Sequence, residues 1–239
     1  MDWTAYAIAW GLAFLCGSIP FAVLIGRAKG VDIRKVGSGN PGATNLGRTL
    51  GRKWGVFCFV LDLGKGLLPV FAFQVIGFLR AATGLGWVEA VADPMWQGGS
   101  YQLTTELSGQ WIGLGVAAVL GHMFSPWIGF KGGKGAATGL GAVLGVFPFV
   151  TLPGVICGLV WVALSKLTGY VGLSSCLSAA ILPVLTGLNG WRLGLERGPM
   201  LVFVGLTALL ATLVIVRHRG NLRRLLAGTE PKAAWTGKA

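Results

Sequence analysis

The segment from Gly37 to Asn45 combines residue types that hold an anion, since it reads Gly-Ser-Gly-Asn-Pro-Gly-Ala-Thr-Asn. Its glycines Gly37, Gly39 and Gly42 allow backbone N–H groups to converge on one point. Polar or cationic side chains stand among and after them at Ser38, Asn40, Thr44, Asn45 and Arg48. Ordinary turns use the same residue types, but so many donors in one segment favour an anion-binding site.

A second glycine-rich segment contains Gly132, Gly133, Lys134 and Gly135 and comes directly before a predicted helix start at 136. The first turn of a helix offers free N–H groups and a partial positive charge, and Lys134 adds a full one. Phosphate is the expected ligand. The segment is not a nucleotide-binding P-loop, because Gly135 stands where Ser or Thr is needed. Taken alone, it is more typical of a cytoplasmic loop with two lysines.

The third candidate cluster follows the last apolar segment and contains His218, Asn221 and Glu230 among several arginines. On a continuing helix His218 and Asn221 share one face. There the imidazole could take or position a hydroxyl proton while the amide orients a substrate. Glu230 is expected to organise the arginines around it. Taken alone, the cluster is more typical of an arginine-rich segment after a membrane helix.

Two further polar groups lie in or beside apolar segments. Asp62 and Lys65 are spaced so that they neutralise each other on one helix face. A charged residue within a membrane segment indicates function by default, although such a pair also braces a helix that lines a polar cavity. His122 stands near the end of another apolar segment, where we interpret it as a helix cap.

Composition indicates that a lipid bilayer surrounds these groups. Of the 239 residues 54% are hydrophobic and 12% charged, and the mean hydropathy is +0.70, well above the values of soluble domains. The net charge of +12 fits an anionic substrate or membrane surface, and the hydrophobicity argues against nucleic acid. The four cysteines lie in apolar stretches without paired spacing, which predicts neither disulfides nor a zinc site.

The elements that position the clusters are apolar segments long enough to cross about 30 Å of hydrocarbon. They lie near residues 4–26, 53–80, 111–128, 169–189 and 199–217. The stretch 136–165 is too long for one upright helix, and Pro148 and Pro153 predict a break. We predict two short helices at 136–148 and 150–165. These either cross the membrane separately or form a re-entrant hairpin. The prediction is an all-α, polytopic integral membrane protein of about seven transmembrane helices, forming one domain over 1–239.

Charge places the polar clusters at one membrane face. Most of the 20 basic residues fall in loops 27–53, 129–135 and 166–168 and in the tail from 217, which the positive-inside rule makes cytoplasmic. One helix precedes the first of these loops, so the N-terminus is expected outside. A cytoplasmic C-terminus then requires an odd number of crossings. Segment 81–110 is expected outside as well.

The clusters, together with Gly17-Ser18-Ile19-Pro20-Phe21 and Asp62-Leu63-Gly64-Lys65-Gly66, resemble the bacterial acyl-phosphate:glycerol-3-phosphate acyltransferases. No single motif is specific, but their order and spacing over nearly the whole chain jointly are. The resemblance implies transfer of an acyl group from acyl phosphate to the sn-1 hydroxyl of glycerol 3-phosphate, the first acylation of phospholipid synthesis. It implies a multi-pass protein of the bacterial inner membrane with its active site on the cytoplasmic face.

The resemblance also implies roles for the residues. Catalytic roles fall on Ser38, Arg48, Lys134, His218 and Asn221. Substrate binding falls on Gly37, Gly39, Asn40, Gly42, Thr44, Asn45, Gly132, Gly133, Gly135 and Glu230. No metal, cofactor or obligate protein partner is expected. The alternative function is a transporter of a phosphorylated organic anion, against which the gathering of donors at one surface and the lack of repeated halves argue. A purely structural scaffold would leave the clustered donors unexplained.

Overall fold

The computed structural model describes the backbone of residues 3–83 and 103–233, and the regular structure in these ranges is helical. The elements are α1 (Trp3–Ser18), α2 (Phe21–Ala28), α3 (Ala43–Leu50), α4 (Arg52–Thr83), α6 (Thr105–Met123), a short 3₁₀ turn η1 (Pro126–Ile128), α7 (Ala136–Leu144), α8 (Thr151–Thr168), α9 (Val171–Arg192), α10 (Arg197–Arg217) and α11 (Arg219–Leu226). The all-α prediction is confirmed.

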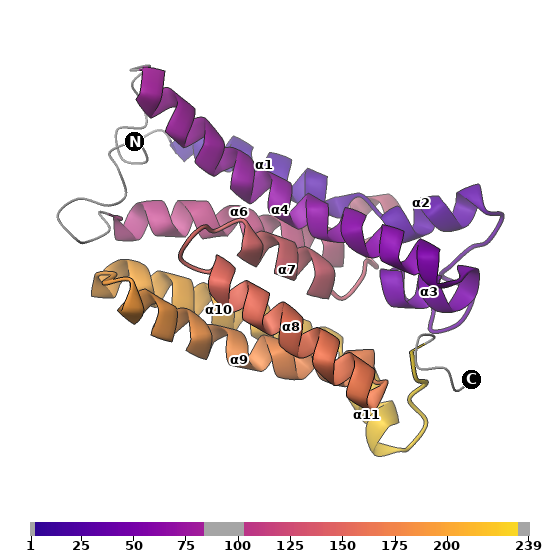
Figure 1. Ribbon diagram of the computed structural model, residues 1–239. Helices are drawn as coiled ribbons and strands as arrows, with labels where there is room; N and C mark the ends of the chain where they lie inside the picture. The colour runs from indigo at the N-terminus through magenta and orange to yellow at the C-terminus, as the bar shows by residue number, and fades with distance from the viewer. Residues whose placement is uncertain (1–2, 84–102, 234–239) are drawn as a thin grey trace.

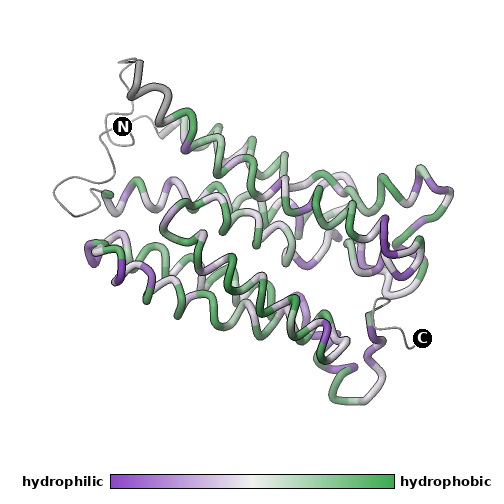
Figure 2. Tube along the Cα trace, in the orientation of Figure 1, coloured by the Kyte–Doolittle hydropathy of each residue, from purple (hydrophilic) through white to green (hydrophobic). Residues whose placement is uncertain are grey.

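The long helices lie side by side in one bundle (Figure 1), in which α6 packs on α1, α7 on α4, and both α8 and α10 on α9. Six segments in the described ranges are long and apolar enough to cross a membrane, the first formed by α1 and α2 together. This is one fewer than the seven or so that the sequence predicted. Apolar residues run along the helices, and polar ones lie around α3, α11 and the α6–α7 loop at one end of the bundle and at the α9–α10 turn at the other (Figure 2). The helix α1 begins at the opposite end of the bundle.

The first predicted span, 4–26, is broken rather than continuous. Pro20 has no N–H to donate, and the helix stops at Ser18 and resumes at Phe21. The carbonyl of Ile19 accepts the N–H of Phe21 over 3.1 Å, and at the break it also accepts a hydrogen bond from the Lys65 ammonium over 2.7 Å. The break therefore gives a buried lysine a main-chain acceptor.

The division of 136–165 is present, but both boundaries differ from the prediction. The helix α7 ends at Leu144 and α8 begins at Thr151, with Pro148 in the turn between them and Pro153 in the first turn of α8, where proline is tolerated. Nine residues rise roughly 14 Å, so α7 cannot cross the bilayer. It enters the bundle from the polar end, and α8 returns to that end (Figure 1).

Two predicted loops contain helices. Residues 105–110, predicted as part of an outside segment, form the first turns of α6. Polar residues there mask the helix in hydropathy, and the Thr104 side chain caps it by accepting the N–H of Leu107 over 3.1 Å. Within loop 27–53, α3 is a short amphipathic helix. The remainder of segment 81–110 falls largely outside the described residues.

Close approach between α4 and α7 depends on glycine, which yields a stability prediction. A Cβ at Gly66 would lie 2.0 Å from the carbonyl oxygen of Thr138, whereas a Cβ at Gly64, two residues earlier on α4, would meet nothing within 4 Å. We expect Gly66→Ala to destabilise the protein by about 1–3 kcal/mol through overpacking and Gly64→Ala to leave stability nearly unchanged. Thermal unfolding in detergent measures both, and equal melting temperatures would contradict the packing argument.

Candidate active site

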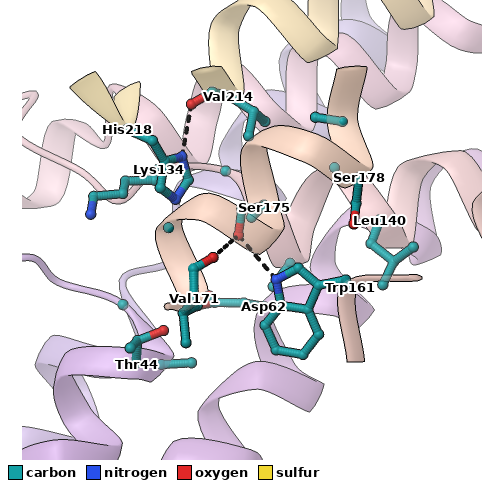
Figure 3. A pocket seen from close by; sticks show the side chains of 18 of the residues that line it. Thr44, Asp62, Lys134, Leu140, Trp161, Val171, Ser175, Ser178, Val214 and His218 are labelled. Carbon is teal, nitrogen blue, oxygen red and sulfur yellow. Dashed lines mark hydrogen bonds between the residues drawn. The ribbon is translucent and has the colours of Figure 1, made fainter. Parts of the chain in front are cut away.

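A cavity of about 170 Å³ runs from the polar loops into the apolar bundle. At its polar end it is lined by Ser38, Asn40, Gly42, Thr44, Asn45, Arg48, Lys134, Gly135, His218 and Asn221. Deeper in, the lining includes Phe59, Leu140, Val143, Cys157, Trp161 and Leu182. Figure 3 shows the division, with Lys134 and His218 on one side and Leu140 and Trp161 on the other. The cavity thus suits a molecule with an anionic head and an apolar tail.

Helix N-termini surround the polar end. The first residues of α3, α7 and α9 all line the cavity, and none of these helices has a side-chain hydrogen bond at its N-cap. The free N–H groups of a first turn carry partial positive charge. Three such ends meeting beside Arg48 and Lys134 create a region of positive potential suited to phosphate.

The predicted first motif divides into lining residues and framework residues. The buried side chain of Asn45 donates to the carbonyls of Ile33 and Val36 over 3.0 and 3.1 Å and accepts the N–H of Ser38 over 2.9 Å. It therefore holds the loop in shape. Gly37 has a φ of +58°, and a Cβ there would lie 2.3 Å from the Asn45 Oδ1. Gly37 and Gly39 are not among the lining residues.

The second motif requires a correction. The N–H groups of Gly132 and Gly133, predicted to hold phosphate, donate instead to the carbonyls of Met123 and His122, each over 3.1 Å. A Cβ at Gly132 would lie 2.0 Å from the His122 oxygen, and one at Gly133 would lie 2.1 Å from the His122 Nε2. These glycines allow close packing of the loop on α6. The donors that reach the cavity come from Lys134, Gly135 and the start of α7.

Lys134 begins a chain of polar contacts at the mouth of the cavity. Its ammonium donates to the Oδ1 of Asn221, whose Nδ2 donates to Glu230 over 2.6 Å. The Nε of Arg224 donates to the other oxygen of Glu230 over 2.8 Å. Burial lowers the pKa of Lys134 to about 8, against the opposing influence of the Glu230 carboxylate. Glu230 thus contacts one arginine, as expected, and orients Asn221 rather than lining the cavity itself.

His218 is the N-cap of α11, so the helix does not continue through it as assumed from the sequence. Both His218 and Asn221 still line the cavity. The Nδ1 of His218 lies 2.8 Å from the carbonyl oxygen of Val214 (Figure 3). Since a carbonyl only accepts, we assign the hydrogen to Nδ1, which leaves a lone pair on Nε2. Burial lowers the pKa of His218 to about 4, and the positive charge of Lys134 adds to that effect.

Arg48 reaches the cavity from α3. Its Nη2 donates to the carbonyl of Pro231 over 2.8 Å, while its Nε is buried without a hydrogen-bond partner among the described residues. Burial lowers the pKa of Arg48, although an arginine remains charged at any relevant pH. A buried guanidinium N–H without a partner is expensive unless a ligand accepts it. An anion beside Arg48 satisfies that requirement.

Several lining residues were not predicted as site residues. Asp62 and His122 line the cavity, and the Nδ1 of His122 lies 3.7 Å from the Asp62 carboxylate, so His122 is more than a cap. Trp161 donates to the Ser175 hydroxyl over 3.0 Å in the apolar part. The charge of Asp62 in an apolar helix was the signal for this pair, but nothing in the sequence connects it to His122.

The fold and the cavity define a polytopic integral membrane protein with an anion-accepting region at one end of the bundle and an apolar chamber behind it. The sequence profile of the glycerol-3-phosphate acyltransferases matches residues 7–228. The chain therefore belongs to the glycerol-3-phosphate acyltransferase family and is an acyltransferase, which confirms the resemblance noted in its motifs.

Individual relatives agree with this assignment. A glycerol-3-phosphate acyltransferase of Geobacter sulfurreducens is 40% identical over 223 residues, covering 93% of this chain and 95% of the relative. One from Agrobacterium fabrum is 36% identical and covers 97% of this chain and 93% of the relative. The structure of PlsY, an integral membrane glycerol 3-phosphate acyltransferase, in its glycerol 3-phosphate form has a TM-score of 0.70 at 33% identity and covers 95% of both chains. Its lysophosphatidic acid form has a TM-score of 0.68.

Proposed function

We propose that this protein transfers a fatty acyl group from acyl phosphate to the sn-1 hydroxyl of glycerol 3-phosphate and releases lysophosphatidic acid and phosphate. The observation that carries the proposal is a cavity in which an anion-accepting end adjoins an apolar chamber. Both substrates bear phosphate, and one also bears an acyl chain. Each part of the cavity therefore has a matching chemical group in the reaction.

In the reaction, the glycerol hydroxyl oxygen attacks the carbonyl carbon of the acyl phosphate. The bond from that carbon to the bridging oxygen then breaks, and phosphate leaves with the electron pair. A substrate phosphate oxygen takes the hydroxyl proton, assisted by the free Nε2 of His218, while Asn221 orients the hydroxyl. Fixed donors near Lys134 stabilise the negative charge that develops on the carbonyl oxygen.

The two phosphates require two sets of donors. One set comprises Ser38, Asn40, Thr44, Arg48 and the start of α3. The other comprises Lys134, Gly135 and the start of α7. Asn45 and Glu230 shape these sets through their hydrogen bonds to neighbouring residues. All of them lie at the end of the bundle where basic residues gather, and we assign this end to the cytoplasmic face of the bacterial inner membrane.

An assay with purified protein in detergent tests the function. Acyl phosphate and radiolabelled glycerol 3-phosphate are expected to yield labelled lysophosphatidic acid, whereas acyl-CoA or acyl carrier protein as the donor is expected to yield none. Protein reconstituted into vesicles provides the contrast with a transporter. Uptake of label without an acyl donor, together with no acylated product in detergent, would overturn the enzyme proposal.

A further inference from the structure

A buried ionic cluster borders the same cavity as Lys134 and takes no part in the reaction described above. The Asp62 carboxylate lies 2.8 Å from the Lys65 ammonium and 3.7 Å from the Nδ1 of His122, and all three side chains are buried. The Cys58 thiol is directed at the other carboxylate oxygen over 3.6 Å. Lys65 is in turn bonded to the carbonyl of Ile19. The cluster therefore joins the α1–α2 break, α4 and the end of α6.

The other face of the His122 ring is occupied by the loop that carries Lys134. Its Nε2 fills the position where a Cβ of Gly133 would stand, and the main-chain oxygen of His122 accepts the Gly133 N–H over 3.1 Å. One ring nitrogen thus faces Asp62 and the other is covered by Gly133. Both ring nitrogens thus have protein neighbours, and His122 contacts the loop that carries Lys134.

Arg217 holds the same loop from α10. Its Nη2 donates to the carbonyl oxygens of Gly132 and Gly133 over 2.9 and 3.0 Å. The main-chain N–H groups of Gly132 and Gly133 are therefore bound by α6, and the carbonyl oxygens of the same two glycines are bound by α10. The next residue is Lys134, and α7 begins two residues later. The loop is therefore held from both sides. Any movement of it would change the direction of the Lys134 ammonium and of the first turn of α7.

We propose that His122, fixed by Asp62 and opposed by Arg217, is a positioning residue that sets the Lys134 ammonium and the α7 N-terminus against the phosphate of a substrate. The proposal rests on the proposed function and adds a role for a buried ionic cluster. A displacement of about 1 Å at a reacting group costs up to two orders of magnitude in rate. We expect His122→Ala to raise, by about tenfold, the KM for the same phosphorylated substrate that loss of Lys134 affects, with kcat changed less.

A double-mutant cycle separates positioning through Lys134 from general damage. His122→Ala is measured in the wild-type and in the Lys134→Met protein, and its tenfold effect on KM is expected to shrink to less than about threefold in the second background. The control is Trp127→Phe, which removes a 2.8 Å hydrogen bond to Ser18 just beyond α6 and is expected to act equally in both backgrounds. An equal effect of His122→Ala in both backgrounds would overturn the proposal.

A second variant keeps the test open if His122→Ala does not fold. Asp62→Asn combined with Lys65→Met removes both buried charges together and leaves no uncompensated ion. The double variant removes the carboxylate partner of His122. The effect of this double variant on KM is also expected to diminish in the Lys134→Met background. Retention of the full effect there would refute positioning through Lys134. Absence of lysophosphatidic acid from the wild-type protein would instead refute the proposed function, so the two failures are distinct.

Discussion

Replacing His218 by alanine is expected to lower kcat by roughly 10²- to 10⁴-fold, the usual contribution of a positioned acid–base group. The side chain lines the cavity, and its Nδ1 is committed to the Val214 carbonyl, so the reactive Nε2 is held in one orientation. The measurement is turnover at saturating glycerol 3-phosphate and acyl phosphate. Full turnover would remove His218 from the chemistry.

His218→Asn provides the matched control. Its amide N–H is able to donate to the Val214 carbonyl in place of Nδ1, yet no base remains at the position of Nε2. We expect it to be as slow as the alanine variant but more stable to heat. Because the pKa of His218 is lowered to about 4, the neutral, proton-accepting form prevails above that pH. Protonation of His218 is therefore not expected to lower kcat between pH 5 and 8. A fall in kcat below about pH 6.5 that both variants abolish would contradict the lowered pKa of His218.

The parts of the fold that the sequence predicted are those with strong local signals. Long apolar runs indicated the spans, and Pro148 marked the division of 136–165 because proline cannot continue a helix. Helix ends were less accurate. The start of α6 carries Glu106 and other polar residues, and α3 is amphipathic and too short for a hydropathy signal. Such elements depend on packing rather than on propensity: α3 packs on α4, and α6 packs on α1.

The candidate site was predictable to the level of residue types, not of hydrogen bonds. Glycine-rich segments beside positive charge indicated anion binding, and the charged and polar members Arg48, Lys134 and His218 do line one cavity. The sequence does not reveal that the Gly132 amide is consumed by the Met123 carbonyl. Nor does it reveal that Asp62 meets His122, because that contact joins helices far apart in the chain.

Replacing Lys134 by methionine is expected to raise the KM for a phosphorylated substrate by roughly 30- to 100-fold, the cost of losing a hydrogen bond between charged groups. The variant keeps the length and the apolar stem of the side chain, which limits damage to packing. The measurement is initial rate against the concentration of each substrate in turn. An unchanged KM for both substrates would count against phosphate binding by Lys134.

The pH dependence of the wild-type enzyme gives an independent test. The pKa of Lys134 is lowered to about 8, so the ammonium is present below that pH and is progressively lost above it. Since kcat/KM reports ionisations of the free enzyme, it is expected to fall above about pH 8. A substrate phosphate does not explain such a limb, because its second ionisation is complete by then. The Lys134→Arg variant keeps its charge throughout this range. Its kcat/KM is expected to be lower than that of the wild type at pH 7 but constant up to about pH 9.5. If the fall in kcat/KM above pH 8 persists in this variant, the ionisation belongs to another group.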